Sequence, residues 1–191
     1  MTSAGTDTMR LGAALPDFSL ADVRTGQPVS AGDAPGTPLL LAFICNHCPF
    51  VRHILGGFLE FAKQYQALGL TVVAVSSNDV ARHPEDGPEH MAELARSAGF
   101  TFPYLYDESQ RIALACQAAC TPEFFLFDRE RRLAYRGRFD AARPSRPTPV
   151  TGADLRAAAD AVLQGRPVPA DQPASIGCGI KWKAGNEPAT G

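Results

Sequence analysis

The sequence predicts one α/β domain with a mixed central sheet and helices on both faces. Three observations indicate this class: short apolar runs that fit buried strands, longer segments of helical periodicity between them, and a hairpin pattern towards the end. A chain of 191 residues is long enough for about one domain with extensions. We expect the domain over residues 11–165, beginning with a β extension, and a C-terminal extension over residues 166–191.

The first half of the domain predicts a β extension and then the centre of the sheet. Residues 17–23 fit a strand that ends in a turn at Thr25-Gly26. Residues 39–44 are uninterruptedly apolar, which is typical of a strand buried on both faces. The apolar residues that follow recur at helical spacing up to about Gly69, so a long amphipathic helix is expected there.

The second half continues the alternation of strands and helices. Strands are predicted over residues 71–76, 104–106, 123–127 and 133–139. Helices are predicted over residues 88–98, 109–118 and 153–163. The last two strands are joined by a short polar segment, which indicates an antiparallel hairpin. The tail after Gly165 is rich in proline and glycine and has no helical period.

Composition excludes several classes of partner. With 18 basic and 20 acidic residues the net charge is -2, so we expect neither nucleic acid nor a membrane surface as partner. The longest apolar run, Pro38 to Cys45, is far shorter than the roughly 18 residues of a membrane-spanning helix. Met1 to Arg10 lack the apolar stretch of a secretory signal, which predicts a cytoplasmic protein. No cofactor is expected.

Five cysteines in such a chain indicate thiol chemistry or metal binding rather than a disulfide framework. Cys45 and Cys48 enclose Asn46-His47 where the apolar strand turns into the long helix. Spaced three apart in a first helical turn, the two sulfurs are expected within bridging reach. The helix N-terminus favours thiolate over thiol, and a protonated His47 adds to this effect. We therefore predict a redox-active pair in which the pKa of Cys45 is lowered.

Two other interpretations of the pair remain open. Two ordinary buried cysteines would not explain the polar Asn-His insert between them. Half of a zinc site would fit the spacing, but no second CxxC or HxxxH is present, so Cys116, Cys120 or Cys178 would have to converge on it. No metal is therefore expected.

The order of these motifs resembles the thioredoxin fold. This resemblance is based on the CxxC motif after a buried strand and on Thr121-Pro122 before the strand at 123–127. The stretch Leu15-Pro16-Asp17-Phe18-Ser19-Leu20 and residues 70–106 are similar to the redoxins, the branch of alkyl hydroperoxide reductase and thiol-specific antioxidant. The resemblance implies that Pro122 is cis and faces the pair. It also implies that the Thr121 backbone pairs with an extended substrate segment.

The chain departs from both parent patterns. Peroxiredoxins carry Pro-x-x-x-Thr/Ser-x-x-Cys; with Cys48 in the peroxidatic position, Leu41 and Cys45 stand in the other two places. Ile44 stands where thioredoxins have a tryptophan. The sequence therefore resembles a peroxiredoxin scaffold that bears a thioredoxin-type pair.

These observations predict a thiol-disulfide oxidoreductase. The Cys45 thiolate would attack a substrate disulfide, and Cys48 would resolve the mixed disulfide. The alternatives are a peroxide reductase, in which Cys48 forms a sulfenic acid that condenses with Cys45, and a non-catalytic binding module or metal carrier. The expected partners are a protein disulfide or a peroxide and a thiol reductant; a homodimer stays open.

Two further cysteines are candidate thiols of the site. Cys120 lies two residues before Pro122, so its sulfur is a candidate neighbour of Cys45. Cys178 is flanked by glycines and precedes Trp182, the only tryptophan. This pattern indicates a segment that docks on the domain. It would supply a resolving thiol, cover the position of the missing tryptophan, or anchor the tail without chemistry.

Overall fold

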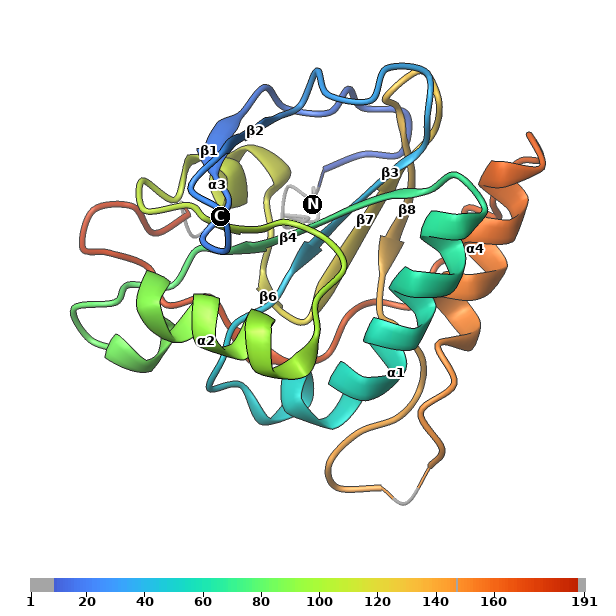
Figure 1. Cartoon of the computed structure of the whole chain (residues 1–191). Helices are drawn as coiled ribbons and strands as arrows, with labels where there is room; N and C mark the ends of the chain where they lie inside the picture. Colours follow the sequence, from blue (N-terminus) through green and yellow to red (C-terminus); the bar gives the residue numbers. More distant parts are fainter. Residues whose placement is uncertain (1–8, 147, 189–191) are drawn as a thin grey trace, which may run out of the picture.

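A five-stranded mixed sheet forms the centre of the protein (Figure 1), in a computed structural model that describes residues 9–146 and 148–188. The strands run in the order β5 (Tyr104–Tyr106), β4 (Thr71–Ser76), β3 (Leu39–Phe43), β7 (Glu123–Phe127) and β8 (Leu133–Gly137). Neighbours among β5, β4 and β3 pair in parallel, whereas β7 pairs antiparallel with both β3 and β8. The mixed sheet and its hairpin confirm the predicted fold class.

Helices cover both faces of this sheet. One face carries α1 (Pro49–Ala67), α2 (Pro88–Ala98) and α4 (Ala153–Leu163), and the other carries α3 (Arg111–Cys116) with the hairpin of β1 (Ser19–Ala21) and β2 (Pro28–Ser30). Alternate side chains of one strand point to opposite faces. Leu40 and Ala42 accordingly pack with the first group, and Leu39 and Leu41 with the second. No helix in the described part of the chain is long and apolar enough to cross a membrane.

Several boundaries differ from the sequence prediction. The helix α1 begins at Pro49 with Cys48 as its N-cap, so the expectation that both sulfurs lie in the first helical turn is wrong for Cys45. The helix α3 is shorter than predicted because Gln110 and Gln117 adopt left-handed backbone angles at its two ends. The strand β8 ends at Gly137, after which Arg138 donates its amide to the tail carbonyl of Pro173.

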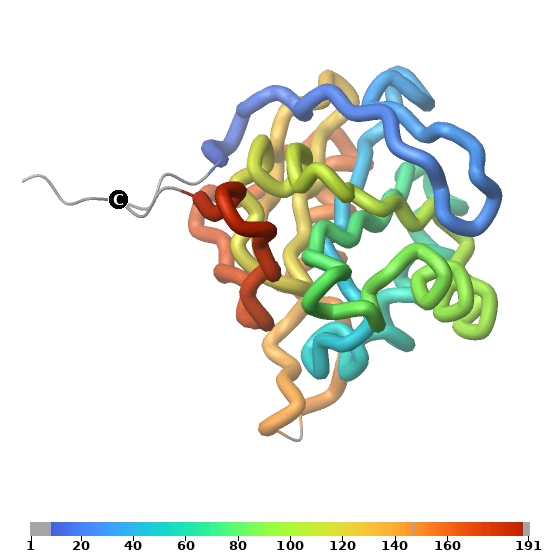
Figure 2. The backbone as a smooth tube through the Cα atoms, turned by 90° about the vertical axis from the view of Figure 1, so that its left-hand side faces the viewer, coloured from blue at the N-terminus to red at the C-terminus, as the bar shows by residue number. Residues whose placement is uncertain are grey.

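Three short elements around the cysteines and in the loop after β4 were not predicted. A 3-10 turn, η1 (Pro84–Asp86), interrupts the loop after β4. The two-residue strands β6 (Cys120–Thr121) and β9 (Cys178–Gly179) pair antiparallel, which fixes the C-terminal tail beside the start of β7. Figure 2 shows this red segment against the olive and yellow part of the chain. The expectation of no secretory signal concerns residues 1–10, of which the first eight lie outside the described residues.

Candidate active site

The sheet topology brings three loops to one edge. Because β3 and β4 are parallel, the residues that follow them leave the sheet at the same edge. The strand β7 is antiparallel to β3, with Phe43 opposite Glu123, so β7 begins where β3 ends. Cys45 after β3 and Thr121-Pro122 before β7 therefore meet, and the Thr121-Pro122 peptide bond is cis, as the resemblance implied.

Thr121 contacts both sulfurs of the pair. Its hydroxyl lies 3.4 Å from the Sγ of Cys45, and its carbonyl oxygen lies 3.1 Å from the Sγ of Cys48. All five cysteines are free thiols, and Cys45 and Cys48 are 1% and 0% exposed. The structure thus gathers the predicted pair and the predicted proline loop into one buried site.

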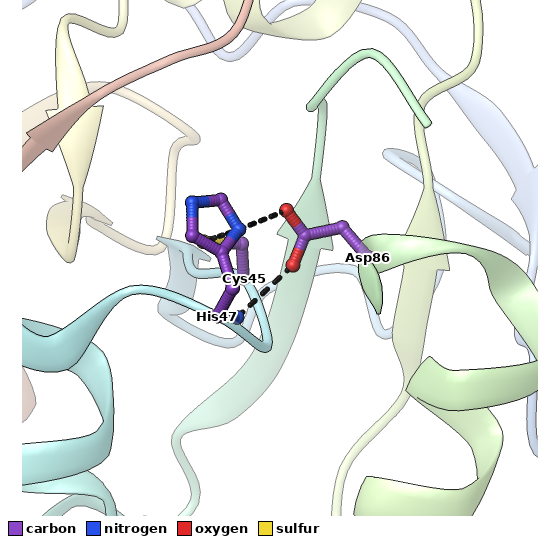
Figure 3. Close-up of side chains that lie close together, drawn as sticks. All are labelled: Cys45, His47 and Asp86. Atoms are coloured by element: carbon purple, nitrogen blue, oxygen red, sulfur yellow. Dashed lines mark hydrogen bonds and ion pairs between the residues drawn. The ribbon is translucent and has the colours of Figure 1, made fainter. Parts of the chain in front are cut away.

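Asp86 fixes the loop between the two cysteines (Figure 3), and its side chain is fully buried. Its Oδ1 accepts hydrogen bonds from the backbone amides of Asn46 and His47, at 2.8 and 3.1 Å. Its Oδ2 lies 2.6 Å from the Nδ1 of His47 and accepts a hydrogen bond from the side chain of Asn78 at 2.8 Å. The sequence prediction missed Asp86, because an acidic residue in a loop has no periodicity or spacing that marks it.

The environment of Cys48 lowers the pKa of its thiol. The largest cause is the hydrogen bond from Cys45, and the backbone amide of Val51 and the thiol of Cys178 act in the same direction. Burial opposes them, because it disfavours the charged thiolate, and the Thr121 side chain adds a smaller lowering contribution. The hydrogen-bond donors outweigh burial, so Cys48 is the more acidic member of the pair.

The pKa of Cys45 is raised, which corrects the prediction that His47 and the helix terminus would lower it. The proton that Cys45 shares with Cys48 is the largest cause, followed by burial and by the negative charge of Asp86. Cys45 also lies before the helix, where the N-terminal amides favour Cys48 instead. The reduced pair thus keeps its proton on Cys45 and its negative charge on Cys48.

Removal of the Cys45 donor is expected to raise the pKa of Cys48. In Cys45→Ala this pKa should rise by about 1 to 2 pH units, since a hydrogen bond to a charged group contributes about 1.5–3 kcal/mol. In Cys45→Ser the hydroxyl still donates, so the rise should be smaller. The pH profile of Cys48 alkylation by iodoacetamide, followed by peptide mapping, gives both values. Identical profiles for wild type and Cys45→Ala would contradict the assignment.

An open cleft of about 330 Å³ reaches the site from the side of α1 and α2. Cys45 and His47 line it together with Arg52, Glu85 and His90. The Nδ1 of His47 lies 3.9 Å from the Sγ of Cys45, but its proton is donated to the Oδ2 of Asp86 at 2.6 Å, so this nitrogen does not take the proton of Cys45. Because Cys45 lines the cleft and Cys48 does not, Cys45 is the member of the pair that an external disulfide meets from this side.

The other cysteines occupy three different settings. Cys178 packs against the cluster that contains Cys48, and its pKa is raised by burial and then by its interaction with Cys48. Cys120 interacts with Cys48 only through charge, and burial raises its pKa to about 12. Cys116 is fully buried on α3. The structure therefore places Cys178, rather than Cys120, beside the pair.

Among the residues that the structure describes, two sets of side chains have donor atoms close enough to share a metal ion. They are Cys45, His47 and Asp86, and His47, His83 and Glu85. Both sets need the Nδ1 of His47, which is engaged with Asp86 at 2.6 Å. The His47 ring also stacks on His83, with centroids 4.8 Å apart. A metal would have to displace the contact between His47 and Asp86.

Comparison with protein-family models matches residues 11–136 to the AhpC/TSA family. The chain belongs to this family. The match confirms the resemblance to the redoxins that the N-terminal motif and the block at 70–106 indicated. Both Leu15 and Cys48 fall within the matched residues.

Solved structures extend the likeness over nearly the whole chain. An uncharacterized conserved protein from Geobacillus kaustophilus is 48% identical, with a TM-score of 0.89, over 92% of this chain and 93% of that one. A hypothetical protein from Sinorhizobium meliloti 1021 is 49% identical, with a TM-score of 0.90, over 94% and 98%. A thiol:disulfide interchange protein from Chlorobium tepidum TLS shares the thioredoxin-like fold at 17% identity, with a TM-score of 0.62 over 82% and 99%. No curated protein matches the sequence.

Proposed function

We propose that the protein is a thiol-disulfide oxidoreductase that uses Cys45 and Cys48 as its redox pair. The observation that carries this proposal is Thr121, whose hydroxyl and carbonyl contact one sulfur each from the start of β7. Membership of the AhpC/TSA family supports a redox function. Buried cysteines that served only packing would not need a thiolate stabilised at a helix N-terminus.

In the proposed reaction Cys45 forms the mixed disulfide, because it borders the cleft. Cys45 gives its proton to water in the cleft, and its sulfur attacks one sulfur of the substrate disulfide while the other leaves as a thiolate. The Cys48 thiolate then attacks the Sγ of Cys45, the bond between Cys45 and the substrate breaks, and the Cys45–Cys48 disulfide forms. The lowered pKa of Cys48 supplies this second nucleophile at neutral pH.

A trapping experiment tests this order of events. The variants also lack Cys178, the neighbouring thiol, so that only one sulfur of the pair remains. With a small disulfide such as 5,5′-dithiobis(2-nitrobenzoate), Cys48→Ser/Cys178→Ser is expected to keep the aromatic thiol bound at Cys45, because no resolving thiolate remains. Cys45→Ser/Cys178→Ser should release less than about a tenth of the wild-type product in a single turnover. Peptide mapping locates the adduct. An adduct at Cys48 in Cys45→Ser/Cys178→Ser that forms as fast as the wild-type reaction would refute the assignment of Cys45 as the attacking sulfur.

A thiol peroxidase that reacts at Cys48 is the second candidate, and the lowered pKa of this thiol favours it. Two observations weigh against it. Cys48 does not line the cleft that Cys45 borders. Arg136, in the strand where peroxiredoxins hold an active-site arginine, is bound to Glu123 and to the carbonyl of Gln117 instead. Stopped-flow oxidation discriminates: a rate at Cys48 far above that of a small thiol would support the peroxidase.

The proposal includes a protein disulfide as substrate and a thiol reductant that regenerates the pair, in the cytoplasm. It requires neither nucleic acid nor a membrane, and it does not depend on a homodimer. The binding-module alternative predicts stoichiometric zinc in the purified protein together with no disulfide reductase activity. That combination would overturn the proposed function.

A further inference from the structure

The C-terminal tail occupies the strand edge beside the redox pair. Cys178 lies directly opposite Thr121 in the antiparallel register of β6 and β9. Directly opposed residues of such a pair have Cα atoms only about 4.5–5.5 Å apart. Since the carbonyl oxygen of the same Thr121 is 3.1 Å from the Sγ of Cys48, the register brings Cys178 to Cys48. The backbone of Thr121 is also expected to pair with an extended substrate segment. In this structure the tail pairs with Thr121 and so occupies the position of such a segment.

The tail is held there by specific contacts. A Cβ atom on Gly177 would lie 2.0 Å from the carbonyl oxygen of Thr121, so only glycine fits at this approach. Beyond Cys178 the amide of Lys181 donates to Asn78, which in turn donates to Asp86. Ile180 is buried against the cluster around α3. Adventitious packing of a loose terminus would not produce this set of contacts.

Exposure distinguishes Cys178 from the pair. Cys45 and Cys48 are buried, whereas Cys178 is half-buried. A disulfide between Cys45 and Cys48 therefore borders only the cleft at Cys45, whereas one between Cys48 and Cys178 has a half-buried sulfur on the side of the tail. We propose that Cys178 is a third redox-active thiol, which takes over the disulfide of the pair by bonding to Cys48 and presents it to external thiols. This inference rests on the proposed function.

The exchange balances without a further oxidant. The Cys178 thiolate attacks the Sγ of Cys48, the Cys48–Cys178 bond forms, and the Cys45–Cys48 bond breaks with its electron pair on Cys45. Cys45 takes up one proton, equal to the one that Cys178 released. An external thiolate then attacks the Sγ of Cys178, and the electron pair leaves on Cys48. The remaining mixed disulfide at Cys178 is reduced by a second external thiol.

The full-length Cys45→Ser protein isolates this step. In oxidised glutathione, the adduct first formed at Cys178 should be attacked by Cys48, which leaves a Cys48–Cys178 linkage and free glutathione. In Cys45→Ser/Cys48→Ser the adduct should persist, at a level roughly tenfold higher, since a tethered thiol acts at about millimolar effective concentration. Cys45→Ser/Cys120→Ser is the matched control, because Cys120 lies on β6, the strand that pairs with the strand of Cys178, and it should behave like Cys45→Ser.

Peptide mapping by mass spectrometry decides between the outcomes. A Cys48–Cys178 linkage that survives removal of Cys120 supports the proposal. Equal glutathione adducts at Cys178 with and without Cys48, or neither adduct nor linkage, would overturn it. Wild-type protein in the same buffer tests the proposed function separately, because it must form the Cys45–Cys48 disulfide whether or not Cys178 takes part.

Discussion

Gly177→Ala is expected to release the tail from the redox site and to expose Cys48. The new Cβ would lie 2.0 Å from the carbonyl oxygen and 2.6 Å from the carbonyl carbon of Thr121. Both are backbone atoms of the loop that holds the pair, so the glycine segment must move instead. Such overpacking costs about 1–3 kcal/mol, which shifts the opening equilibrium of β9 about 5- to 150-fold. The rate of Cys48 alkylation in the reduced protein should rise by the same factor.

Gly179→Ala provides the matched control for this prediction. It lies on β9, two residues after Gly177, and its Cβ would meet nothing closer than the carbonyl oxygen of Ala119 at 3.9 Å, an ordinary contact. Its alkylation rate should stay within about twofold of wild type. Cys116, fully buried on α3, reports global unfolding in the same digest and should stay protected. Equal Cys48 rates in the two glycine variants would show that the tail does not shield this sulfur.

Much of the fold follows from the sequence because the strands and helices have clear periods. The strands β4, β5 and β7 and the helices α2 and α4 have the predicted bounds, since apolar runs and Pro–Gly boundaries mark them. The sequence also indicated that Cys45 and Cys48 lie beside Thr121-Pro122 and that this peptide bond is cis, because short motifs mark both. Elements of two or three residues, such as η1 and β9, leave no periodic signal.

The electrostatics of the site depend on contacts between residues far apart in the sequence. The spacing of Cys45 and Cys48 shows which sulfurs meet, but it does not show which of them carries the charge. That depends on Asp86, 41 positions after Cys45 and buried beside it, and on Cys178 from the tail. The exact start of α1 also matters, because it gives the helix amides to Cys48 alone. The sequence does not mark the acid, and it indicates that the segment around Cys178 docks on the domain but not that it lies beside Cys48.

Substitution of Asp86 by alanine is expected to destabilise the reduced protein by about 3–5 kcal/mol, as removal of one partner from a buried ion pair does. The carboxylate accepts hydrogen bonds from two backbone amides, from Asn78 and from the ring of His47, and all these donors would be left unpaired. Asp86→Asn keeps one accepting oxygen but turns an NH₂ group towards Asn78 and His47. It should therefore cost less, about 1–3 kcal/mol. Urea unfolding of the reduced variants gives both values.

The Asp86→Asn protein also tests the charge distribution of the pair. In the wild-type protein the negative charge of Asp86 is one cause of the raised pKa of Cys45. Loss of this charge should lower the pKa of Cys45, so that Cys45 reacts with iodoacetamide at lower pH. Glu85→Gln is the control: this carboxylate is 50% exposed and 3.8 Å from His47, and surface pairs contribute only about 0–1 kcal/mol. Two results together would contradict both roles of Asp86. If Asp86→Asn loses no more stability than Glu85→Gln, Asp86 does not hold the loop. If the pH profile of Cys45 alkylation is also unchanged, Asp86 does not determine which sulfur keeps the proton. If Asp86 has only a structural role, Asp86→Asn should lower the free energy of unfolding without changing the pH profile of Cys45 alkylation.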